Sequence, residues 1–137
     1  MRMGTRFLLD TNVLIDFFAQ RFSEKAESFV AQIMVEDILL SVINKIELLG
    51  FSKCEKEMSK IVEVARIFYL DEIIANKTIE IRKTQKIKLP DAVIAATAIC
   101  ENLVLLSNNE DDFKGIRGLK FLNPHKYDDN ISLFRNF

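Results

Sequence analysis

Apolar and polar residues fall into blocks of different length along the chain. Five short apolar runs, at residues 6–9, 38–43, 67–70, 103–106 and 119–122, have the length of buried strands. The longer segments between them carry apolar residues at helical spacing. They predict helices at residues 13–19, 53–65, 71 to about 87, and 92–100. They also predict one helix that begins at residue 23 and another that ends at residue 50. Short strands alternating with helices predict an α/β fold whose parallel sheet is covered on both faces.

Three segments depart from simple amphipathic patterning. Residues 92–100 carry almost no polar side chain, so we expect this helix, which begins near Pro90, to be buried on several sides. Residues 108–114 are polar and predict a loop. The tail after Pro124 is polar except for a few apolar residues that could pack back on the fold, namely Ile131, Leu133, Phe134 and Phe137.

Length and composition indicate one globular domain spanning residues 1–137, with 49% hydrophobic and 28% charged residues. The net charge of −1 argues against a protein that binds nucleic acid through overall positive charge, but it leaves room for a local basic patch. Cys54 and Cys100 have no metal-ligand spacing, and His125, expected at the surface, is the only histidine. No secretory signal or membrane span is apparent, so we expect a reduced, cytoplasmic setting.

Four acidic residues lie where predicted elements start or stop. Asp10 follows an apolar run, Glu47 lies inside the apolar stretch 46–49, Asp91 opens the buried helix, and Asp112 precedes Phe113. Carboxylates that border a core are costly unless something positive holds them. A divalent cation such as Mg²⁺ or Mn²⁺ would do so, and it would let a water molecule attack a phosphodiester. Because ligand crevices of parallel sheets lie at the carboxyl ends of the strands, Asp10 and the 107–112 loop are expected at one rim.

Each acid also has an ordinary structural explanation. Asp10 could cap the following helix, and Asp91 could be stabilised by the dipole of the helix that it opens. Glu47 could be a solvated helix residue, and Asp112 could belong to a solvated turn.

A basic run precedes Asp91 in the chain and has two interpretations. Its members are Arg82, Lys83, Lys86 and Lys88. They are typical of a solvated helix end, or they contact a phosphate backbone beside the metal pocket.

Four segments together resemble a known family. They are FLLDTNVLID at 7–16, SVINKIELLG at 41–50, LPDAVIAATAICENLVLLSNNEDDF at 89–113 and GLKFLNP at 118–124. The chain resembles a PIN domain and, more narrowly, the VapC-type toxins of prokaryotic toxin–antitoxin pairs. The resemblance covers nearly the whole chain, and the order and spacing of the motifs agree with the family.

The resemblance implies a three-layer α/β/α sandwich with a central, mostly parallel sheet of four to five strands. It also implies an endoribonuclease that uses one or two Mg²⁺ or Mn²⁺ ions and leaves a 5′-phosphate and a 3′-hydroxyl. The implied partners are RNA, a second copy of the chain in a homodimer, and a small antitoxin whose peptide occupies the active-site groove.

Carried over by position, Asp10 and Asp91 are the principal metal ligands and Glu47 is the third acid, with Asn12 and Ser107 in support. The fourth motif departs from the family, because Asn109 stands where many relatives carry an acid, two residues after Ser107. The fourth acid then comes from Asp112, Asp111 or Glu110, or it is absent. Asn109 can still orient a water molecule or bind metal through its carbonyl oxygen.

Two other functions fit parts of the pattern. One is a catalytically weak PIN-like module that binds RNA or a protein, which the missing acid at position 109 keeps open. The other is an aspartyl-phosphate hydrolase of the haloacid dehalogenase type with Asp10 as nucleophile. That family usually has a second acid two residues later, where Asn12 stands here.

Overall fold

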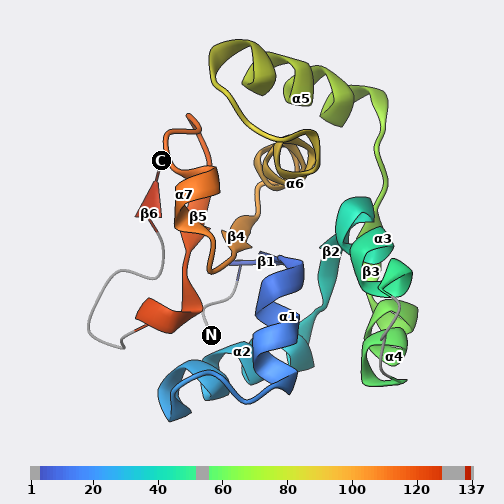
Figure 1. Cartoon of the computed structure of the whole chain (residues 1–137), viewed down its shortest axis with the longest axis vertical. Coiled ribbons are helices and arrows are strands. Elements are labelled where there is room, and N and C mark those ends of the chain that lie inside the picture. Colours follow the sequence, from blue (N-terminus) through green and yellow to red (C-terminus); the bar gives the residue numbers. More distant parts are fainter. Residues whose placement is uncertain (1–3, 52–55, 128–134, 137) are drawn as a thin grey trace.

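The computed structural model describes residues 4–51 and 56–127 and the backbone of residues 135 and 136 (Figure 1). The elements in chain order are β1 (Phe7–Leu9), α1 (Thr11–Phe18), α2 (Glu24–Glu36), β2 (Leu39–Ser41), α3 (Val42–Gly50), α4 (Lys56–Val64), β3 (Arg66–Phe68), α5 (Glu72–Thr84), α6 (Leu89–Cys100), β4 (Val104–Leu106), α7 (Glu110–Phe113), β5 (Lys120–Leu122), the 3₁₀ helix η1 (Pro124–Lys126) and β6 (Arg135–Asn136). The apolar tail residues 131, 133, 134 and 137 lie outside the described residues.

The sheet has the strand order β3-β2-β1-β4-β5-β6. The first five strands are parallel, and the short β6 runs antiparallel to β5. The predicted α/β fold with a mostly parallel sheet is therefore confirmed. β1 lies in the middle of the sheet and pairs with β2 on one side and with β4 on the other. The order in which strands are added to the sheet therefore reverses beside β1, and this position is the topological switch point of the sheet.

Helices cover both faces of the sheet because side chains of a strand alternate between its faces. Leu8 of β1 packs on one face with residues of α5, α6 and α7. Its neighbours Phe7 and Leu9 pack on the other face with residues of α1, α2 and α4. The apolar segment of α6 is buried from Ala92 to Ala98, as the sequence predicted, since α6 contacts α3, α5, α7, β2 and β4.

Polar side chains set the starts of several helices. Ser23 caps α2 by accepting a hydrogen bond from the amide of Ala26, and Asp71 caps α5 in the same way from Ile74. Ser41 ends β2 and caps α3 in a reciprocal arrangement with Asn44. These caps make the chain turn from strand to helix directly after the sheet, which is where the acidic residues lie.

Three local details differ from the expectation. Helix α1 begins at Thr11, two residues before the predicted start at residue 13, and Asp10 caps it. The expected loop 108–114 contains the short helix α7, and the helix expected to reach about residue 87 ends at Thr84. Within the described part of the chain, no helix has both the length and the apolar character needed to cross a membrane.

Candidate active site

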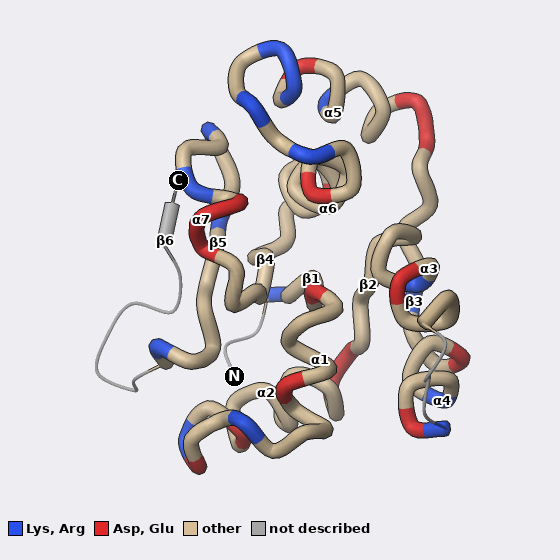
Figure 2. The backbone as a smooth tube through the Cα atoms, viewed as in Figure 1, with Lys and Arg blue, Asp and Glu red and all other residues tan. Residues whose placement is uncertain are grey.

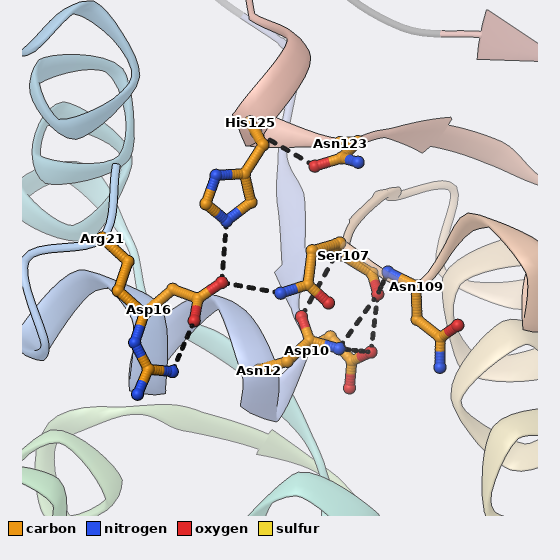
Figure 3. Close-up of polar contacts among 9 residues, drawn as sticks. Asp10, Asn12, Asp16, Arg21, Ser107, Asn109, Asn123 and His125 are labelled. Carbon is orange, nitrogen blue, oxygen red and sulfur yellow. Dashed lines mark hydrogen bonds and ion pairs between the residues drawn. The ribbon is translucent and has the colours of Figure 1, made fainter. Parts of the chain in front are cut away.

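Asp10 sits at the carboxyl end of the central strand, and its carboxylate is held by four donors. Its Oδ1 accepts hydrogen bonds from the amide of Thr11 at 2.9 Å and from Asn44 Nδ2 at 3.2 Å. Its Oδ2 accepts from Ser107 Oγ at 2.8 Å and from Asn12 Nδ2 at 3.1 Å, as Figure 3 shows. Only 6% of Asp10 is exposed. The carboxylate therefore has one fixed orientation, and it caps α1 while also facing the site.

The supporting residues come from three different strand ends. Ser107 follows β4, which is hydrogen-bonded to β1, and Asn12 lies in the first turn of α1. Asn44 lies in the first turn of α3 directly after β2 and is fully buried. The sequence predicted Ser107 and Asn12 as supporting residues but missed Asn44. A buried amide inside the apolar segment 42–49 was the feature that could have indicated it.

Glu47 and Asp91 lie on the walls of a cavity of about 560 Å³ that Asp10 also lines. Glu47 projects from α3, and its Oε1 accepts a 2.6 Å hydrogen bond from the hydroxyl of Thr11. Asp91 lies in the first turn of α6 and is half-buried. The cavity thus brings together three of the four predicted acids, from the end of β1, from within α3 and from the start of α6.

The pKa values of Asp91 and Asp10 respond to burial and to the neighbouring acids. Burial, followed by the charges of Asp112 and Asp10, a hydrogen bond with Asp112 and the charge of Glu47, raises the pKa of Asp91 to about 6. Burial also raises the pKa of Asp10, and Glu47 adds to this, although the hydrogen bonds from Ser107, Thr11 and Asn44 oppose it. All four predicted acids therefore share one electrostatic environment, and negative charge accumulates there.

Asp112 is the member of the 109–112 group that approaches Asp91. Its Oδ2 accepts a 2.6 Å hydrogen bond from Asn109 Nδ2, and Asn109 itself lines the same cavity as Asp91. The other two acids of this group form ion pairs with lysines. Glu110 pairs with Lys126 at 2.9 Å, and Asp111 pairs with Lys114 at 3.5 Å. The geometry thus separates Asp112 from its neighbours, which the sequence left open.

The donor set suits a hard divalent cation, but the side chains do not form a ready cage. Among the residues that the structure describes, no three Asp, Glu, His or Cys side chains are grouped closely enough to hold a metal ion. The oxygens of Asp10 are already occupied by donors, and Glu47 is bound to Thr11. Mg²⁺ usually keeps several waters and needs only one or two carboxylates, so the acids that line this cavity suit such an ion chemically even without a complete cage.

A second polar cluster, which the sequence analysis missed, lies beside the site. Asp16 of α1 is only 7% exposed, and it accepts hydrogen bonds from Arg21 at 3.2 Å and from Asn108 Nδ2 at 2.6 Å. His125 Nε2 lies 2.8 Å from the same carboxylate (Figure 3). His125 is exposed, as expected, and it also lies against the ring of Phe22.

Comparisons with known proteins agree with this fold. The family model of the PIN domain matches residues 7–119. A chain of a toxin–antitoxin complex from Klebsiella pneumoniae shares 31% sequence identity, with a TM-score of 0.68 over 85% of this chain and 96% of that one. The FitAcB structure from Neisseria gonorrhoeae gives 25% identity and a TM-score of 0.70 over 88% and 99% of the two chains.

VapBC-1 from nontypeable Haemophilus influenzae shares the fold, with a TM-score of 0.73 at 24% identity, over 89% of this chain and 100% of that chain. The comparison with curated protein sequences gives no significant match. A parallel sheet with carboxylates gathered at its switch point defines an α/β protein of the PIN type. The chain belongs to the PIN domain family, and its structural relatives are chains of toxin–antitoxin complexes.

Proposed function

We propose that this single domain of residues 1–137 is a metal-dependent endoribonuclease, the toxin component of a type II toxin–antitoxin pair. The observation that carries the proposal is the cavity shared by Asp10, Glu47 and Asp91, in which the pKa of Asp91 is raised to about 6 by burial and by the neighbouring acids. Acids that repel one another in a half-buried pocket favour a cation, and a phosphodiester is the substrate class that such a cation serves.

In this proposal Asp10 and Asp91 hold Mg²⁺ or Mn²⁺, one ion or two, and Glu47 reaches it directly or through water. The ion would supply an activated water molecule and stabilise charge on the phosphate oxygens. Ser107, Asn12 and Asn44 keep Asp10 in one orientation, and Asn109 keeps Asp112 beside Asp91. Hydrolysis joins the water oxygen to phosphorus and breaks the P–O3′ bond. The 3′ oxygen takes up a proton, which leaves a 3′-hydroxyl and a 5′-phosphate.

The test is cleavage of a defined RNA by the purified protein with Mn²⁺ or Mg²⁺, compared with Asp91→Asn and Asp10→Asn. Loss of a group that acts at the reacting phosphate should lower the rate on the order of 100-fold or more. Asp37→Asn is a matched control, because Asp37 lies in an exposed pair with Arg6 at 3.8 Å. Undiminished cleavage by Asp91→Asn, with the preparation free of other nucleases, would contradict the assignment.

A catalytically weak module that binds RNA or protein is the second candidate, and Asn109 in place of an acid favours it. Titration calorimetry with Mn²⁺ at neutral pH separates the two. Binding that disappears in Asp10→Asn supports the nuclease, whereas absence of binding supports the module. The aspartyl-phosphate hydrolase gains no support, because Asn12 stands where that family has its second acid and donates a hydrogen bond to Asp10 Oδ2.

The apolar wall of the same cavity supports the proposed antitoxin partner. Ile15, Phe18, Leu48, Phe51 and Met58 line it beside the acids. An apolar groove next to carboxylates suits a peptide that carries apolar residues followed by a basic side chain. We also propose a homodimer and a cytoplasmic location. Light scattering with size-exclusion chromatography tests the dimer, and a search for a small reading frame directly upstream, followed by co-expression with its product, tests the antitoxin.

A further inference from the structure

Asp91 borders a second cavity, of about 470 Å³, whose lining contains none of the apolar residues of the first cavity. The acidic wall of this second cavity consists of Asp91, Asp111 and Asp112. Its other wall is basic and consists of Arg82, Lys86 and Lys88, with Gln85 and Ile87 between them. We call these three cations the basic wall. Since Asp91 lines both cavities, both border the proposed catalytic centre.

The basic wall is built by the end of α5 and the segment that joins it to α6. Figure 2 shows the blue positions descending from the end of α5 to the red position at the start of α6. Arg82 lies in the last turn of α5, and Lys86 and Lys88 lie in the connection. All three side chains are exposed. Pro90 and the buried face of α6 fix where this segment enters the helix, so the cations keep their place beside Asp91.

The cations of the basic wall face the acids without pairing with them. None of Arg82, Lys86 and Lys88 forms a side-chain hydrogen bond or an ion pair with any residue in the described ranges. The pKa of Asp91 is governed by burial and by other acids, which agrees with the absence of a close cation. The cavity therefore has three cations on one wall, unpaired among the described residues, opposite three acids on the other, so the groups that can bind an anion are confined to the basic wall.

We propose that this cavity binds a backbone phosphate of the RNA, next along the strand to the phosphate that is cut at Asp91. This inference rests on the proposed nuclease function and adds to it the path of the substrate. The strand would cross Asp91 with the reacting phosphate at Asp10 and a neighbouring phosphate on the basic wall. The guanidinium of Arg82 can donate two parallel hydrogen bonds to two oxygens of one phosphate, and Lys86 and Lys88 can attract the phosphate as point charges. Such contacts set register and carry no base specificity.

Lys83 provides an internal control for this inference. It follows Arg82 in the chain, is exposed, and lies outside the lining of the cavity. A solvated helix end would make Arg82 and Lys83 equivalent toward RNA, whereas a phosphate site in the cavity makes only Arg82 important.

The experiment compares two triple variants of equal charge. One is Arg82→Gln with Lys86→Gln and Lys88→Gln. The other is Lys83→Gln with Lys60→Gln and Arg117→Gln, which changes three exposed cations outside the cavity. Fluorescence anisotropy measures binding of a labelled single-stranded RNA in Ca²⁺ over a range of salt concentrations. Each neutralised phosphate contributes about 0.7 to the slope of log K against log salt, so loss of the one proposed phosphate contact should lower the slope of the cavity variant by about 0.7 and that of the control by close to nothing.

Cleavage in Mn²⁺ supplies the second measurement. The cavity variant should raise KM for a long RNA about 10-fold or more at low salt while kcat stays near the wild-type value. A dinucleotide has only the reacting phosphate, so its cleavage should not change. Single variants Arg82→Gln and Lys86→Gln, each compared with Lys83→Gln, keep the test valid if the triple variant is poorly folded.

Four results separate this inference from the proposed function. A wild-type salt slope and KM in the cavity variant would overturn the inference while leaving the nuclease intact, and so would equal losses in both triple variants. If the wild-type chain binds RNA through the cavity but cuts none, the nuclease proposal fails and the phosphate site stands. If the wild-type chain binds no RNA, the phosphate site is excluded.

Discussion

Asp16 and His125 are in direct contact across a separation of 109 residues, with Oδ2 of the carboxylate 2.8 Å from Nε2 of the imidazole. The same oxygen accepts a hydrogen bond from Asn108 Nδ2. The backbone amide of Asn108 donates to Asn12 Oδ1 at 3.1 Å, and Asn12 in turn donates to Asp10 (Figure 3). Asp16 therefore joins α1, the segment after β4 and the η1 turn into one unit that supports the orientation of Asp10.

Asp16→Ala should destabilise the fold and weaken the site together. The substitution leaves Asn108 and His125 without their shared acceptor, which should cost about 2–4 kcal/mol in the free energy of unfolding. Because Asp16 acts on Asp10 only through Asn108 and Asn12, we expect Mn²⁺ affinity to fall about 10- to 100-fold. Urea denaturation and calorimetry measure the two effects. Asp37→Ala should change either quantity very little, since its ion pair is exposed.

Ionisation of Asp16 should make the free energy of unfolding depend on pH. Burial raises the pKa of this carboxyl, but the hydrogen bonds from His125, Asn108 and Arg21 outweigh burial and lower it below 3.8. A lowered pKa means that the ionised carboxyl stabilises the fold at pH values above 3.8. That contribution is lost as the pH falls through the folded pKa. Urea unfolding as a function of pH should therefore show a decline below pH 3.8 in the wild-type chain that is smaller in Asp16→Asn.

Asp91 should have the opposite effect on stability. Its pKa of about 6 lies above the ordinary 3.8, so the folded chain holds a proton there that the unfolded chain releases. Stability should decrease as the pH rises from about 4 to about 6 and remain lower above that range. Asp91→Asn should consequently raise the Tm of the metal-free protein at pH 7.5 by a few degrees at most, since Asp91 is partly exposed, and leave it unchanged at pH 4. Equal shifts at both pH values would show that ionisation of Asp91 is not the cause.

Asn109 and Asp112 should act as one unit. Asn109→Ala removes the donor that holds Asp112 beside Asp91, so it should lower RNA cleavage about 10-fold, and Asp112→Asn should have a similar effect. The double variant should be little worse than either single variant, because both changes break the same contact. Glu110→Gln is the control, since Glu110 pairs with Lys126 instead. Simple multiplication of the two single effects would show that Asn109 and Asp112 act independently.

The parts of this protein that sequence reasoning recovered have local causes. Uninterrupted apolar runs predicted the buried strands, and Asp10 and Asp91 stood out because each follows or opens a buried element. The sequence analysis did not predict roles for Asn44 and Asp16, because their hydrogen-bond partners lie 34 and 92 residues away, at Asp10 and Asn108. The choice of Asp112 over its neighbours depends on where α7 points its side chains, and a helix of four residues has too little periodicity to detect.

The position of β1 also bears on when the cavity comes into existence during synthesis. This central strand can pair with β2 early, but its other neighbour, β4, is translated almost a hundred residues later, and Asn109 later still. A ribosome-bound chain that lacks this last part has Asp10 with no Ser107 to hold it and no completed wall. Whatever chemistry the acids perform must therefore wait until most of the polypeptide has been made, and premature termination upstream of residue 107 should yield inert fragments.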